Sequence, residues 1–141
     1  MTISKAEASW SGTLNEGKGS VKGSSGRFEA PFSFATRFEG AAGGTTPEEL
    51  IGAAHAGCFS MFLAAQLSKA GHPPKSINTT ASVTLDAGPL VTKIELSVVA
   101  VVPGADDKLF QEKVAFSHQN CPISKALAAV PMVTVNAKLA T

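Results

Sequence analysis

The sequence predicts an α+β fold forming a single domain over residues 1–141. Two observations carry this prediction. Residues 75–86 and 90–102 alternate apolar and polar side chains, as half-buried strands do, whereas the uncharged stretch between Glu49 and Lys69 follows strong helix-start signals. Taken along the chain, the expected elements follow the order βββ-α-ββ-αα-β, without the regular strand–helix alternation of a parallel α/β protein.

The first third of the chain is expected to be β structure. Residues 5–14 place Trp10 and several alanines on mostly alternate positions and end at a turn-prone Asn-Glu-Gly. A second short strand is predicted over about residues 19–22, and a third around residues 28–34. The glycine-rich residues 40–45 then predict a flexible loop.

The clearest local signal is a helix start. Thr46 can cap the helix, Pro47 suits its first position, and Glu49 completes a capping box. The predicted helix runs from Pro47 to about Ala70 and stops at Gly71.

This helix is apolar nearly all round. Its glycines, His55 and other polar residues make it weak as a membrane span, so we interpret it as a core helix of a soluble protein. Two small-residue pairs, Gly52/Ala56 and Ala53/Gly57, permit close approach of another backbone. An oligomer is therefore expected, the alternative being that the two sheets of one chain wrap the helix completely.

The C-terminal half predicts a hairpin, two helices and a last strand. Residues 75–86 and 90–102 are joined by a turn at residues 86–89. A helix is expected from Asp106 or Asp107 to about His118, and a short one from Cys121–Pro122 to about Val130. Residues 133–139 predict the final strand.

Composition excludes several classes of protein. Hydrophobic residues make up 44 % and charged residues 16 %, and twelve basic against eleven acidic residues leave a net charge of +1. Nothing here favours nucleic acid or an anionic membrane as partner. The two cysteines exclude a disulfide scaffold, and the N-terminus lacks the apolar stretch of a signal peptide, so a reducing, cytoplasmic location is expected.

The two cysteines are the chemical candidates. Cys58 lies in the middle of the long helix, and Cys121 lies at an expected helix N-terminus, where the helix dipole favours a thiolate. Both could instead be small core residues. Zinc is a rival, because His55 and Cys58 share a helical face, but too few further ligands exist, and no metal is expected. His55 is interpreted as a core or hydrogen-bonded histidine.

Three segments carry a resemblance. TRFEG (residues 36–40), TPEELIGAAHAGCFS (residues 46–60) and NCPISKAL (residues 120–127) are similar to signature segments of the OsmC/Ohr family, the osmotically inducible and organic hydroperoxide resistance proteins, and look most like its OsmC branch. The resemblance implies two antiparallel sheets around long central helices, in an intertwined homodimer.

The resemblance also implies an activity. It implies a peroxidase that reduces organic hydroperoxides without metal, flavin or haem, with Cys58 as the peroxidatic and Cys121 as the resolving cysteine. Arg37 matches the arginine that polarises the site, and Glu48 matches the glutamate that holds this arginine. A lipoyl-type dithiol is the implied reductant, rather than directly bound NADPH.

Elementary chemistry agrees with these roles. A free thiol is only a few per cent ionised at neutral pH and burial suppresses ionisation further, so a guanidinium beside Cys58 is needed. About ten residues, roughly 15 Å of helix, separate Glu48 from Cys58. We therefore hypothesise that Arg37 and Glu48 serve the cysteines of a partner subunit; a bend at Gly57 is the alternative.

Other functions stay open at this point. The chain could be a redox sensor or a small-molecule binding protein of the same fold without efficient turnover, and a zinc-binding protein is a third possibility. Phenylalanines near both candidate sites could line an apolar pocket, which would favour alkyl and lipid hydroperoxides over H₂O₂, or could simply fill the core.

Overall fold

The computed structural model describes residues 1–140 and contains two compact units that divide between Leu50 and Ile51. The single domain over residues 1–141 stays a prediction. The element order is βββ-αα-ββ-αα-β, which confirms the α+β class and adds one short helix to the expected elements.

The first unit contains a three-stranded antiparallel sheet. Strands β1 (Ala6–Ser11), β2 (Lys18–Gly23) and β3 (Glu29–Phe32) pair in the order β1-β2-β3. Gly19 on the middle strand matters for packing, since a Cβ at this position would lie 2.6 Å from the rings of both Trp10 and Phe32. Because Gly19 has no Cβ, the rings of Trp10 and Phe32 contact each other across β2, with centroids 5.3 Å apart.

A short helix follows where the sequence predicts the end of a strand. Helix α1 (Phe34–Phe38) begins after Ser33, whose hydroxyl accepts from the Thr36 backbone N–H, while the Thr36 hydroxyl accepts from the Ser33 N–H. The expectation that the third strand extends to Phe34 is wrong because this reciprocal cap satisfies the backbone groups of a helical turn instead.

Helix α2 (Pro47–Lys69) matches its prediction closely. The Glu49 backbone N–H donates to the Thr46 hydroxyl at 2.9 Å, which confirms Thr46 as the cap. Only half of the expected capping box forms, because the Glu49 carboxylate accepts from the Thr45 hydroxyl instead. Gly71, with φ of +87°, follows the last turn as predicted, and the His72 N–H bonds the Leu67 carbonyl.

The second unit is built on the sheet of β4 (Ser76–Asp86), β5 (Leu90–Val101) and β6 (Met132–Ala140), in that order. The first two strands form the predicted antiparallel hairpin. Strand β6 pairs with β5 in parallel, so the sheet is mixed rather than fully antiparallel. The reason is the crossover through α3 (Asp107–Asn120) and α4 (Pro122–Ala126), which returns the chain in the direction of β5.

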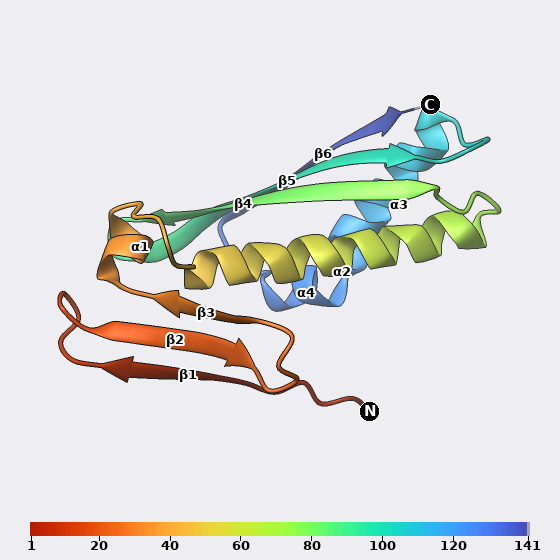
Figure 1. The fold of residues 1–141 in the computed structure, drawn as a ribbon. Coiled ribbons are helices and arrows are strands. Elements are labelled where there is room, and N and C mark those ends of the chain that lie inside the picture. The colour runs from red at the N-terminus through yellow and green to blue at the C-terminus, as the bar shows by residue number, and fades with distance from the viewer. Residues whose placement is uncertain (141) are drawn as a thin grey trace. The chain divides into compact units, whose positions relative to one another are not determined.

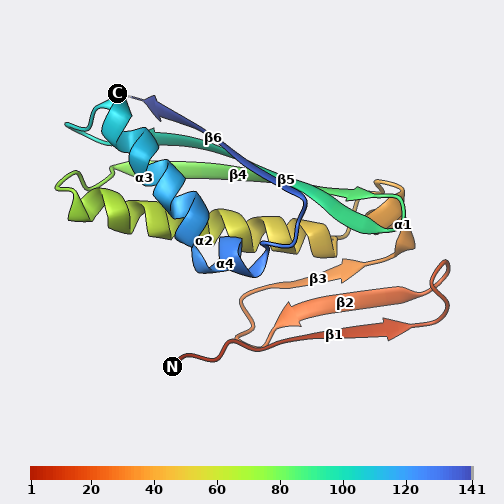
Figure 2. The same cartoon turned by 180° about the vertical axis from the view of Figure 1, so that it is seen from behind.

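Helices α2 and α3 cover the same face of this sheet (Figures 1 and 2). The core between them is formed by side chains from α2, α3, β5 and the segments that follow these elements: Phe59, Leu63, Leu67, Ile94, Leu96, Val98, Ala100, Val102, Phe110, Val114 and Cys121. Their alternate positions on β5 are those that the period-two pattern predicts.

Helix α2 is long and apolar enough to cross a membrane, but three of its large side chains are fully buried in this core, as in a helix of a soluble protein. The opposite face of α2 is not covered by the other elements of the second unit. That exposed stripe, the α2 stripe, consists of Ala53, Ala54, Gly57, Met61 and Ala65.

Candidate active site

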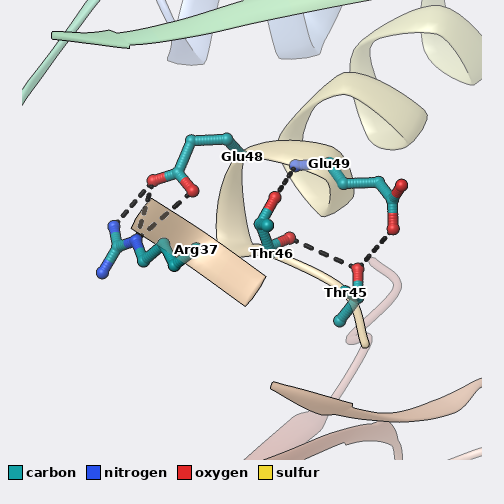
Figure 3. A network of polar contacts seen from close by, with 5 residues as sticks. All are labelled: Arg37, Thr45, Thr46, Glu48 and Glu49. Atoms are coloured by element: carbon teal, nitrogen blue, oxygen red, sulfur yellow. Dashed lines mark hydrogen bonds and ion pairs between the residues drawn. The ribbon is translucent and has the colours of Figure 1, made fainter. Parts of the chain in front are cut away.

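Arg37 and Glu48 form a two-point ion pair within the first unit (Figure 3). The Arg37 Nη2 lies 2.6 Å from Glu48 Oε1, and Nε contacts both carboxylate oxygens at 3.2 and 3.3 Å. The Glu48 side chain is 8 % exposed and that of Arg37 34 %. The second terminal nitrogen of the guanidinium points away from the carboxylate in Figure 3, so this edge of the cation is left for another anion.

Local structure holds this pair in place. Arg37 ends helix α1, whereas Glu48 lies in the first turn of α2, where a carboxylate also suits the helix dipole. Thr45 joins the two helices, because its carbonyl accepts from the Thr36 hydroxyl on α1 and its hydroxyl donates to Glu49 on α2. Its backbone N–H also donates to the Pro31 carbonyl on β3. Sequence reasoning missed Thr45, since a threonine in a glycine-rich loop gives no signal of burial.

Cys58 and Cys121 meet in the second unit. Their sulfur atoms are hydrogen-bonded at 2.8 Å, and both cysteines are free thiols. Cys58 lies on α2 and is half-buried, whereas Cys121 is the N-cap residue of α4 and is fully buried. The expectation that Cys121 occupies a helix N-terminus is confirmed.

The two thiols ionise differently. Burial, followed by the hydrogen bond with Cys121, raises the pKa of Cys58. Burial also acts to raise the pKa of Cys121, but the influence of neighbouring Cys58 and then of Ser124 outweighs burial and lowers this pKa. Within the second unit, therefore, Cys121 is the more acidic thiol, and a cation beside Cys58 is needed to move the negative charge there.

His55 lies one turn before Cys58 and is fully buried. Its Nε2 is hydrogen-bonded to the Ser124 hydroxyl at 2.8 Å, and its Nδ1 is buried without a partner. Burial, and then the charge of His118, lowers the pKa of His55. The interpretation of His55 as a hydrogen-bonded core histidine is confirmed, whereas nothing in the sequence pointed to Ser124.

Between residues 1 and 140, no group of three or more His, Cys, Asp or Glu side chains is placed to hold a metal ion. The four predicted site residues thus form two pairs, Arg37 with Glu48 and Cys58 with Cys121. A thiol pair of this geometry can pass between the dithiol and the disulfide state.

Comparison with known proteins agrees with this chemistry. The family model for OsmC-like protein matches residues 40–136, which include Glu48, Cys58 and Cys121. The chain is also 48 % identical over 134 residues to Peroxiredoxin OsmC of Escherichia coli, covering 92 % of this chain and 93 % of that protein. The chain belongs to the OsmC family. The resemblance in its signature segments is therefore confirmed.

Solved structures share the OsmC-like fold. The OsmC-like protein of Mycoplasma pneumoniae has a TM-score of 0.72 at 18 % identity and covers 99 % of both chains. The organic hydroperoxide resistance protein OhrB of Bacillus subtilis has a TM-score of 0.66 at 24 % identity, over 96 % of this chain and 98 % of that one. At these identities the comparison establishes the fold of this OsmC family member.

Proposed function

We propose that this protein is a thiol-dependent peroxidase that reduces organic hydroperoxides to alcohols. The observation that carries the proposal is the 2.8 Å approach of two free thiols, one of them half-buried, in a member of the OsmC family. The names of its relatives agree, since one is a peroxiredoxin and another is an organic hydroperoxide resistance protein.

The reaction uses both sulfur atoms. The Cys58 thiolate attacks the O–O bond, forms a sulfenic acid and releases an alkoxide, which takes the proton of Cys121 and leaves as the alcohol. The Cys121 thiolate then attacks the Cys58 sulfur, which forms the disulfide and expels hydroxide. An external dithiol, of the lipoyl type, reopens the disulfide by exchange and is oxidised in turn. The cytoplasm suits this cycle because its thiols are kept reduced.

The first step needs a cation, and we assign it to Arg37. Its guanidinium is fixed by Glu48 at two points and keeps one edge for another anion. Beside Cys58 the guanidinium would favour the thiolate on Cys58, so that the proton between the two sulfur atoms is held by Cys121. It would also stabilise the departing alkoxide.

We propose further that Arg37 and Glu48 act on the cysteines of a partner subunit. Glu48 and Cys58 belong to one continuous helix, and the intervening residues correspond to about 15 Å of rise, too far for one guanidinium to contact both side chains. The α2 stripe supplies the surface for such a homodimer, because only 28 % of the most apolar window of α2 is buried within the chain.

The first unit offers a place for the organic group of the substrate. A cavity of about 340 Å³ is lined by Arg37 and Ser33 together with apolar side chains. The apolar members are Trp10, Leu14, Phe32, Phe34 and Phe38. Burying an alkyl chain contributes about 25 cal/mol per Å², a gain that H₂O₂ cannot make, so alkyl and lipid hydroperoxides are the preferred substrates.

The deciding experiment is peroxide consumption with dihydrolipoamide as reductant, run on the natural chain and on Cys58→Ser. We expect steady-state turnover of an alkyl hydroperoxide by the natural chain and none by the variant. Loss of two thiols after one equivalent of peroxide, without turnover, would instead identify a redox sensor. No thiol loss at all would overturn the proposal.

A further inference from the structure

Thr36 lies next to Arg37 on α1 and contacts the segment that leads into α2. Its hydroxyl oxygen is 3.0 Å from the carbonyl oxygen of Thr45, which is only 5 % exposed and precedes Glu48 by three positions. The elements that carry Arg37 and Glu48 are therefore joined at a second point, beside the ion pair itself.

The hydroxyl of Thr36 can serve this contact without leaving another group unpaired. A threonine hydroxyl has one hydrogen and can also accept. The Thr36 oxygen accepts from the Ser33 backbone N–H at 2.9 Å and lies 3.1 Å from the Ser33 carbonyl. That carbonyl also accepts from the Arg37 backbone N–H, so it keeps a donor when the Thr36 hydrogen is directed to Thr45.

The backbone packs closely at the same place. A Cβ on Gly44 would lie 2.8 Å from both the methyl carbon of Thr36 and the carbonyl oxygen of Pro31, closer than ordinary van der Waals contact. The backbone N–H of Thr45 donates to the same Pro31 carbonyl at 2.8 Å. We call these contacts of Thr36 and Pro31 with Gly44 and Thr45 the clasp.

The clasp closes a loop that has little rigidity of its own. Residues 39–46 join α1 to α2 and include three glycines, the residue type that restricts the backbone least. The pair of Arg37 and Glu48 joins only the ends of two flexible side chains. It fixes the guanidinium against the carboxylate, whereas the clasp fixes the backbone of α1 against the start of α2.

We propose that Thr36 is a positioning residue, which acts through the clasp to hold the free edge of the Arg37 guanidinium in the orientation that Cys58 requires. This inference rests on the proposed peroxidase reaction and on the assignment of its cation to Arg37. The attraction between a cation and a thiolate falls with distance, and a misplacement of about 1 Å can slow an enzyme about a hundredfold. Loss of the clasp should therefore leave Cys58 less ionised and less reactive.

The test compares Thr36→Val, which removes the hydroxyl and keeps the shape, with Thr36→Ser, which keeps the hydroxyl. One readout is the pH midpoint of alkylation of Cys58 by iodoacetamide, measured on its peptide by mass spectrometry, because the thiolate is the reacting form. The other is the stopped-flow rate of oxidation of Cys58 by an alkyl hydroperoxide.

We expect Thr36→Val to raise the pH midpoint by about one pH unit and to slow the oxidation at pH 7 about three- to tenfold. Thr36→Ser should restore both readouts. Gly44→Ala should repeat the effect of Thr36→Val, because its new Cβ must move the loop away from Thr36.

An Arg37→Met background shows whether Thr36 acts through Arg37. In that background Thr36→Val should change neither readout further, because the clasp then positions no cation. Thr13→Val is the matched control, since the Thr13 hydroxyl accepts the Glu16 backbone N–H in the turn between β1 and β2. It should leave both readouts of the natural chain unchanged.

Equal effects of Thr36→Val with and without Arg37, or a Thr36→Ser variant that behaves like Thr36→Val, would overturn the proposal and leave Thr36 a cap of α1. If Arg37→Met itself leaves the midpoint of Cys58 unchanged, the assignment of the cation fails, and this proposal fails with it. A natural chain whose Cys58 is not oxidised by peroxide instead overturns the peroxidase function, and the alkylation midpoints then still test the clasp.

Discussion

Cys58 and Cys121 share a hydrogen bond of 2.8 Å although they lie 63 residues apart, one within α2 and the other at the N-cap of α4. One sulfur is half-buried and the other is fully buried. This asymmetry supports the proposal that peroxide first meets Cys58 while Cys121 acts internally, which is the order of roles that the family resemblance implies.

Replacing Cys121 by serine should separate the two halves of the reaction. Cys121→Ser keeps the peroxidatic thiol, so we expect one round of peroxide reduction, no intramolecular disulfide and progressive oxidation of Cys58 to the sulfinic acid. Mass spectrometry after increasing equivalents of hydroperoxide measures this. Two results would show that Cys121 does not resolve the sulfenic acid: continued turnover of this variant with dihydrolipoamide, or a stable adduct between Cys58 and a second thiol.

Mixed dimers can test whether the site is shared between subunits. Arg37→Met and Cys58→Ser should each be inactive alone. If Arg37 serves the partner, each heterodimer formed by co-expression contains one complete site, and the heterodimer separated from the two homodimers should have about half the peroxidase activity of a dimer of the natural chain. Heterodimers that stay inactive would place Arg37 and Cys58 of one chain in the same site.

The α2 stripe makes a prediction about assembly. Met61 is 78 % exposed within the chain, so Met61→Lys should not disturb its fold but should place a charge in the proposed interface and convert the dimer to monomers. Met132→Lys is the control, because Met132 is 53 % exposed at the start of β6. Light scattering gives the oligomeric state, and two variants of equal mass would argue against this interface.

Glu48→Gln should weaken both stability and activity. Arg37 would keep its charge and lose its two-point partner, so we expect the free energy of unfolding to fall by about 1–3 kcal/mol and turnover to fall at least tenfold. Denaturant unfolding and peroxide assays measure the two effects. Glu49→Gln, at an exposed carboxylate in the same helical turn, should change neither by a comparable amount.

The burial of His55 predicts a dependence of stability on pH. Its pKa is lowered from an ordinary value of 6.5, chiefly by burial and then by the charge of His118. Below pH 6.5 His55 therefore binds a proton in the unfolded chain but not yet in the folded chain. The free energy of unfolding decreases as the pH falls toward the lower pKa that His55 has in the folded chain. The difference between the natural chain and His55→Gln isolates this part, and identical pH profiles would contradict it.

The sequence predicted most of the architecture because its local signals and its tertiary structure agree. Thr46, Pro47 and Gly71 bound α2 as expected, and the alternation along residues 90–102 identifies the buried side of β5. Helix α1 was not predicted, because the alternating Phe32 and Phe34 indicate a strand, whereas the cap by Ser33 stabilises a helical turn. The parallel placement of β6 depends on how the α3–α4 crossover packs, which no local pattern records.

The site was predictable in part, for a similar reason. The chemical character of Cys121 follows from its position before Pro122, but its contact with Cys58 depends on a long-range return of the chain, and only the family resemblance implied it. Thr45 and Ser124 carry no sequence signal, because common hydroxyl residues acquire their roles from the neighbours that folding brings to them.

The long chain segment between the two sulfur atoms has a thermodynamic consequence. A covalent link across 63 residues removes conformational freedom from the unfolded ensemble, and for a loop of that size the chain-entropy model gives about 4 kcal/mol in favour of the native state. Peroxide would thus make the molecule it oxidises harder to melt. Reduction by a dithiol would return the protein to the less stable dithiol form, so that it alternates between a more and a less heat-resistant form in each catalytic cycle.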